Sequence, residues 1–136
     1  MVDNTIVELM SLLEKKQLLF DRIMEITLEQ KKVLEENEAD KIESLVGRKQ
    51  SVIDSIDEID MSFSQGLKTL KKHLNVQVLE EVDFTKYPEL KDLKLKVEEI
   101  MSMAQEIMLI ERSNKEKLVS IMNEMKKEIK QIKAGK

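Results

Sequence analysis

The sequence contains no cysteine and few of the residues that build turns and sheets. Its 136 residues include no Cys, one Pro, three Gly and only 3% aromatic side chains. Without Cys, disulfides and thiolate metal sites are excluded. Because strands and their turns draw on Pro, Gly and aromatic residues, a β-sheet protein is not expected. We therefore expect an all-α protein that forms a single helical domain over residues 1–136.

Long hydrophobic runs and a secretion signal are missing as well. No apolar run approaches the ~20 residues that a membrane-spanning helix needs. The N-terminus carries Asp3, Asn4 and Glu8 where a secretion signal would have a basic start. These features predict a cytoplasmic protein that does not insert into a membrane.

Patterns for catalysis, cofactor binding and metal binding are also lacking. The sequence has no Gly-rich phosphate loop and a single histidine, His73. Neighbouring carboxylates such as Glu98 and Glu99 point about 100° apart on a helix, so they do not converge on a substrate. We expect no enzyme activity, no cofactor and no metal ion.

Charge is unevenly distributed along the chain. The net charge is -4, yet residues 113–136 carry seven Lys against three acidic residues. This basic tail has no Arg and no aromatic residue with which to stack or pair nucleotides. A nucleic-acid partner is therefore not expected, and a lysine-rich helix end is the simpler interpretation.

What the chain does have is helical periodicity. Apolar residues recur at alternating steps of three and four, which is typical of helices that pack along a seam. The pattern predicts helices over 4–36, 41–74 and 89–132, joined by a connector at 75–88. At about 1.5 Å per residue the third helix would be roughly 65 Å long. The first helix has two adjoining apolar stripes, which suits contact with two neighbours.

The break between the first two helices is short. Asn37 can adopt a left-handed conformation that ends a helix, and Asp40 with Glu43 resembles a capping box that starts the next one. Because short connections join antiparallel neighbours, we expect a helical hairpin. The predicted architecture is a long antiparallel three-helix coiled-coil bundle, made of this hairpin and a longer third helix.

Several polar residues fall on the apolar seams at one level of this bundle. Register arithmetic from the two connections places Lys49, Gln50, Glu111 and Asn114 near one another, level with Thr27 and Gln30. A buried pair of Lys49 with Glu111 would cost stability but fix the register of the helices. Alternatively, Lys49 and Gln30 extend outward to solvent and only Asn114 lies inside.

The third helix has a surplus of apolar side chains. By the same arithmetic, residues beyond about 124 have no residue of the second helix to face, so the end of the third helix should protrude. Methionine is a common side chain of adaptable binding surfaces. We therefore expect a partner-binding surface on the third helix, made of Met101, Met108, Met122, Met125, Ile129 and Ile132.

The whole pattern resembles the FlgN-type flagellar export chaperones. The resemblance rests on the opening Leu9, Leu12 and Leu13, the acidic turn at 37–40, the Lys49–Gln50 step followed by Val52, Ile53 and Ile56, and Asn114 followed by Leu118 and Ile121 in a long last helix. It implies a bacterial cytoplasmic chaperone that binds the C-terminal helices of the hook-filament junction proteins and delivers them to the flagellar type III export apparatus.

Two other hypotheses stay open at this point. One is a structural coiled-coil scaffold with no export role, whose exposed stripe is buried by formation of a homo-oligomer. The other is a different small secretion chaperone with other clients. The identity of the partner and the oligomeric state distinguish the three.

Overall fold

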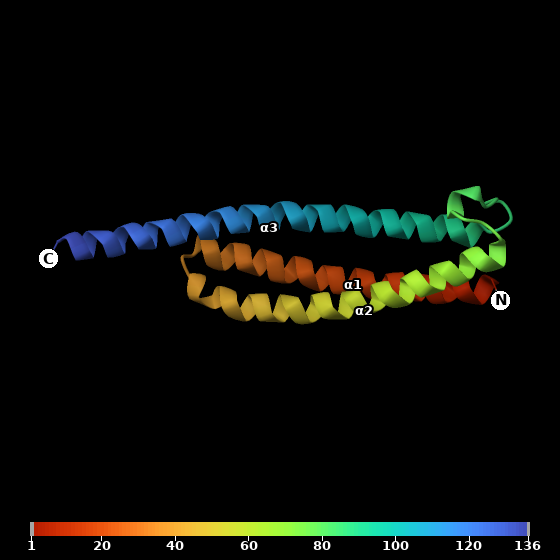
Figure 1. Ribbon diagram of the computed structural model, residues 1–136, viewed down its shortest axis with the longest axis horizontal. Helices are drawn as coiled ribbons and strands as arrows, with labels where there is room; N and C mark the ends of the chain where they lie inside the picture. Colours follow the sequence, from red (N-terminus) through yellow and green to blue (C-terminus); the bar gives the residue numbers. More distant parts are fainter. Residues whose placement is uncertain (1, 136) are drawn as a thin grey trace.

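Three long helices account for most of the chain. The computed structural model describes residues 2–135, with α1 at Val2–Glu35, α2 at Ile42–Leu74 and α3 at Pro88–Ala134 (Figure 1). Two short 3-10 turns, η1 (Ala39–Lys41) and η2 (Leu79–Glu81), lie in the connections. No strand occurs among residues 2–135. The predicted all-α three-helix bundle is thus confirmed.

Helix α1 lies at the centre of the packing. It contacts both α2 and α3 along its length, whereas the backbones of α2 and α3 scarcely approach one another. Figure 1 shows α1 running between the other two helices over the half of the bundle next to the α1–α2 turn. The two apolar stripes of α1 explain this position, because each stripe can face a different neighbour.

The core consists of two buried clusters, one toward each end of the bundle. The cluster next to the connector contains Ile6, Leu9, Leu13, Leu70, Leu90, Leu93 and Ile100. The cluster next to the α1–α2 turn contains Ile23, Ile26, Val33, Leu45, Val52, Ile56 and Ile107. Side chains of all three helices meet in both clusters, so the three helices share one apolar interior.

The α1–α2 turn is tight, but it differs in one respect from the prediction. Asn37 has a positive φ of 60°, as expected for a residue that ends a helix. The capping box predicted at Asp40 and Glu43 is wrong, because α2 begins without a side-chain cap hydrogen bond. The chain enters α2 through η1, so the cap residue Lys41 has near-helical angles (φ -84°, ψ -10°) instead of the extended ones that a side-chain cap requires.

The connector folds over the opposite end of the bundle. Asn75 ends α2 with a φ of 56°, and Pro88 stands at the start of α3. Four connector side chains are partly buried against the core, namely Leu79, Val82, Phe84 and Tyr87. This end of the bundle is therefore covered.

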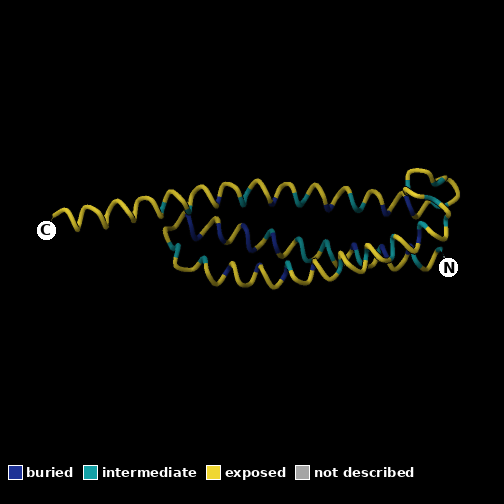
Figure 2. Tube along the Cα trace, viewed as in Figure 1, coloured by how far each residue is buried: buried dark blue, intermediate teal, exposed yellow. Residues whose placement is uncertain are grey.

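At the other end of the bundle α3 is longer than the hairpin, so its last residues are not covered by α1 or α2. Figures 1 and 2 show α3 continuing past the α1–α2 turn as a single exposed helix. Every residue from 122 to 135 is exposed. We call residues 122–134 of α3 the overhang. At about 1.5 Å per residue it is roughly 20 Å long.

Candidate partner-binding site

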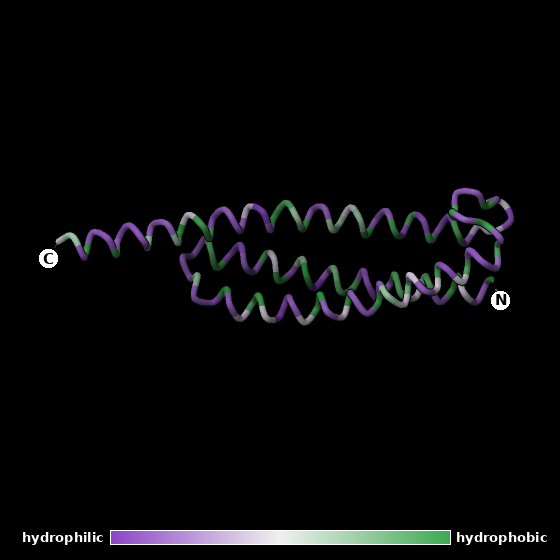
Figure 3. The backbone as a smooth tube through the Cα atoms, in the orientation of Figure 1, coloured by the Kyte–Doolittle hydropathy of each residue, from purple (hydrophilic) through white to green (hydrophobic). Residues whose placement is uncertain are grey.

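The overhang presents one narrow apolar stripe. With about 100° between successive residues of a helix, Met122, Met125, Ile129 and Ile132 fall within roughly 80° of its circumference. In Figure 3 short hydrophobic segments accordingly recur between hydrophilic ones along this part of α3. The four side chains are 49% to 66% exposed, and we call them the overhang stripe.

The overhang stripe continues a face that is covered inside the bundle. Leu118 and Ile121 are half-buried beside the α1–α2 turn. Ile121 and Met125 line the same open hollow as the turn residues Asn37 and Asp40. The stripe therefore occupies the side of α3 that faces the hairpin, at the point where the hairpin stops.

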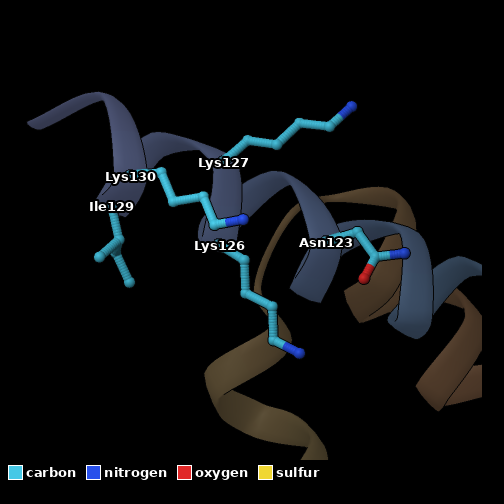
Figure 4. Close-up of a pocket in the computed structure, with 5 residues that line it drawn as sticks. All are labelled: Asn123, Lys126, Lys127, Ile129 and Lys130. Carbon is cyan, nitrogen blue, oxygen red and sulfur yellow. The ribbon is translucent and has the colours of Figure 1, made fainter. Parts of the chain in front are cut away.

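Charged side chains border the overhang stripe differently on its two edges. By helical geometry Lys126, Lys130 and Lys133 fall on one edge, and Glu124 and Glu128 fall on the other. Figure 4 shows Lys126 and Ile129 extending from the same side of α3, while Lys127 extends from the opposite side. The stripe is thus bordered by one basic edge and one acidic edge.

The α1–α2 turn beside the overhang is acidic. Glu35, Glu36 and Asp40 are exposed there, and Glu38 is half-buried. Lys41 is paired with Glu38 at 2.5 Å. The hydrogen bond from Lys41 to Glu38, together with the charge of Glu38, raises the pKa of the Lys41 ammonium group.

Met101 and Met108 lie apart from the overhang stripe. Both are exposed, at 57% and 61%, on the part of α3 that runs alongside the hairpin. Met108 precedes Met122 by 14 residues, or about 21 Å of helix. The six residues predicted as one surface therefore divide into the overhang stripe and an upstream pair.

The polar residues predicted at one level meet in the interior. Lys49 Nζ on α2 donates hydrogen bonds to Gln30 Oε1 on α1 (2.6 Å) and to Glu111 Oε1 on α3 (2.8 Å). Asn114 Nδ2 donates to the Thr27 carbonyl oxygen (3.1 Å). Lys49, Gln30 and Asn114 are buried, so the alternative in which Lys49 and Gln30 extend outward is wrong. Within residues 2–135 no buried side-chain nitrogen or oxygen lacks a partner.

Gln50 does not belong to this layer, contrary to the prediction. It is exposed, and its amide donates to Asp54 Oδ1 on the same helix (2.9 Å). The register arithmetic estimated the height of each residue along the bundle and not the direction in which it points. Because Gln50 follows Lys49 by one position, it points about 100° away from the interior.

A groove beside the polar layer was not singled out from the sequence. It runs between the start of α2 and α3 and is lined by Val46, Lys49, Glu111 and Leu118, among others. Val46 is 51% exposed even though it lies on an apolar stripe of α2. The sequence signal was the apolar Val46 beside the seam of α2, which stays half exposed because α2 and α3 stay apart.

Two other features, a metal-binding group and a membrane-spanning helix, are not found among the described residues. Across residues 2–135 there is no group of three or more His, Cys, Asp or Glu side chains placed to hold a metal ion. In the same range no helix has the length and apolarity to cross a membrane.

Comparison with known proteins gives one result. The family model described as FlgN protein matches residues 1–135, which is essentially the whole chain. No curated protein and no solved structure matches the chain. The match agrees with the resemblance that the helix pattern indicated. The chain belongs to the FlgN family, which is a family of flagellar export chaperones and not of enzymes.

Proposed function

We propose that this protein is a cytoplasmic chaperone of flagellar type III export that binds the C-terminal helical segments of hook-filament junction proteins. Membership of the FlgN family supports the general role. The observation that supports a helical client is the overhang stripe, since its four apolar side chains are 49% to 66% exposed within the described residues 2–135. The flagellar export apparatus is a further partner under this proposal.

The overhang suits a client that is itself an amphipathic helix. A single helix offers a client only one face, and that face holds Met122, Met125, Ile129 and Ile132 at spacings of three and four residues. A client helix with the same spacing can place its apolar side chains between them. Burial of apolar surface is worth about 25 cal/mol per Å², and this gain drives the association.

Calorimetric titration of the full chain with C-terminal segments of junction proteins tests the proposal. We expect dissociation constants of about 1 μM or lower. The double substitution Met122→Glu with Ile129→Glu places two carboxylates in the stripe and should weaken binding at least about tenfold. The matched control is Met101→Glu with Met108→Glu, which changes two exposed residues at the same seven-residue spacing on the same helix. This control should bind like the wild type.

Two results would overturn the proposal. One is the absence of binding by the wild-type chain. The other is unchanged binding by the Met122→Glu, Ile129→Glu variant, which would place the client elsewhere. Light scattering on the free protein examines the scaffold hypothesis, because a stable homo-oligomer that has no affinity for junction segments would support scaffolding.

A further inference from the structure

The charged residues around the overhang stripe indicate which charges a partner should carry, just as the stripe itself indicates an apolar partner face. Residues 122–134 contain four Lys and two Glu, although the whole chain has a net charge of -4. Three of these lysines, Lys126, Lys130 and Lys133, border one edge of the overhang stripe. A helix that docks on the stripe must lie beside this basic edge.

A second copy of the chain is poorly suited to the stripe in an antiparallel arrangement. The two-fold axis of such a pair places each edge of the stripe against the same edge of the other copy. Lys126 and Lys130 would then face lysines, and Glu124 and Glu128 would face glutamates. Facing like charges oppose association.

In a parallel pair the facing charges would be complementary, but the hairpin already occupies the space that the second copy needs. Its two-fold axis would bring the basic edge of one copy against the acidic edge of the other. However, the second α3 would then continue alongside the first on the face that packs against α1. Because Ile100 and Ile107 of α3 are already buried on that face, the second copy would collide with the hairpin.

We propose that the overhang selects a partner helix of a different sequence whose apolar stripe is bordered by acidic residues on the edge that meets Lys126, Lys130 and Lys133. This inference rests on the proposed function, since it specifies the chemistry of the client. The partner helix lies beyond the α1–α2 turn, where it continues the line of the hairpin along α3. About four turns of helix are enough to cover the overhang stripe.

Two adjacent lysines provide the substitution test. Lys126 lies on the basic edge and Lys127 points to the opposite side of α3 (Figure 4). Both side chains belong to exposed residues, so Lys126→Glu and Lys127→Glu make the same change in net charge without altering the packed core. A long-range effect of net charge would act equally on both variants, whereas a contact at the basic edge would act on Lys126 alone.

The probes are two designed 18-residue helical peptides with the same leucine stripe, one bordered by Glu and the other by Lys, titrated into the full chain at low salt. We expect the Glu-bordered peptide to bind about tenfold more tightly, from two or three close charge pairs. Lys126→Glu should remove most of this preference, and Lys127→Glu should retain it. Added salt should reduce the preference as the charges are screened.

Equal binding of the two peptides, or equal effects of Lys126→Glu and Lys127→Glu, would overturn the inference. A homodimer in light scattering that dissociates on Met122→Glu would also overturn it. A junction-protein segment titrated in parallel separates the two proposals. If it binds and Lys126→Glu has no effect, the proposed function stands and the charge selection is wrong. If only the Glu-bordered peptide binds, the charge selection stands and the junction-protein client is wrong.

Discussion

Lys49 on α2 and Glu111 on α3 form an ion pair of 2.8 Å between two helices whose backbones scarcely approach one another. The two side chains differ in their access to water, with 11% of Lys49 and 41% of Glu111 exposed. Gln30 of α1 accepts a second hydrogen bond from Lys49. Together with Gln30, the pair therefore joins all three helices at one level and contributes to their register.

Removal of the two partners should have unequal effects on stability. Glu111→Met leaves a buried ammonium group with only Gln30 as a partner, and it should lower the free energy of unfolding by about 2 kcal/mol. Lys49→Met leaves a carboxylate that can reach water, and about 1 kcal/mol is expected. The double variant should be less destabilised than the sum of the two single variants. Urea unfolding measures all three.

The neighbouring pair of Arg48 and Glu29 is the matched control. It also joins α2 to another helix, but its atoms are 3.5 Å apart and its side chains are 55% and 50% exposed. Arg48→Met should change the free energy of unfolding by less than about 0.5 kcal/mol. If Glu111→Met lowered the free energy of unfolding no more than Arg48→Met does, the buried layer would contribute nothing specific to stability.

Two glycines of α2 should respond in opposite directions to alanine. A Cβ at Gly66 would lie 2.7 Å from Leu9 Cδ2, and Leu9 is only 1% exposed, so it has little room to move. Overpacking costs about 1–3 kcal/mol, which exceeds the gain of about 1 kcal/mol in helix propensity. Gly47 has nothing within 4 Å of such a Cβ, so only the gain applies. Thermal unfolding should show a lower Tm for Gly66→Ala and a higher Tm for Gly47→Ala. A higher Tm for both variants would mean that α1 and α2 are not closely packed at Gly66.

The connector contains a carboxylate with a shifted titration. Asp83 Oδ1 accepts hydrogen bonds from the Thr85 hydroxyl (2.6 Å) and the Thr85 backbone N–H (2.9 Å). The hydroxyl hydrogen bond, followed by the backbone one, lowers the pKa of Asp83 below its ordinary value. A lowered pKa in the folded state adds stability above the unfolded-state pKa, and this stability is lost as pH falls through the folded-state pKa.

Thr85→Val should therefore raise the pKa of Asp83 toward its ordinary value. It removes the hydroxyl donor, which is the larger cause of the shift, and keeps the backbone N–H. NMR titration of the Asp83 carboxyl carbon in both proteins is the measurement. An identical midpoint in the two would show that the connector does not hold this turn in solution.

Much of the fold follows from periodicity, because apolar residues at steps of three and four predict helices that pack along a seam. The level of Lys49 with Glu111 and Asn114 was also predictable, since register arithmetic from the two connections places these residues at one height along the bundle. The direction in which the Gln50 side chain points was not predictable, because an error of one residue rotates a side chain by about 100° around the helix. The start of α2 was missed for a local reason, since η1 makes the turn with backbone hydrogen bonds where the sequence suggested a side-chain cap.

The candidate site was predictable only in part. The overhang follows from the unequal lengths of the hairpin and α3, which the sequence pattern reveals. The separation of Met101 and Met108 from the overhang stripe does not follow from the sequence, because a seven-residue repeat has the same pattern whether or not a hairpin covers it. The structure shows the turn residues Asn37 and Asp40 beside Ile121 and Met125, well past Met108 along α3.

Hydrogen exchange of the full chain with and without a junction-protein C-terminal segment tests the central claim that the overhang binds the client. In the free protein, amides of residues 122–134 should exchange fastest within α3, because a helix without packing partners is marginally stable. At a segment concentration about 100 times its dissociation constant, exchange there should slow by up to about 100-fold. Slowing confined to α1, α2 or the Met101–Met108 stretch, with residues 122–134 unchanged, would contradict the account.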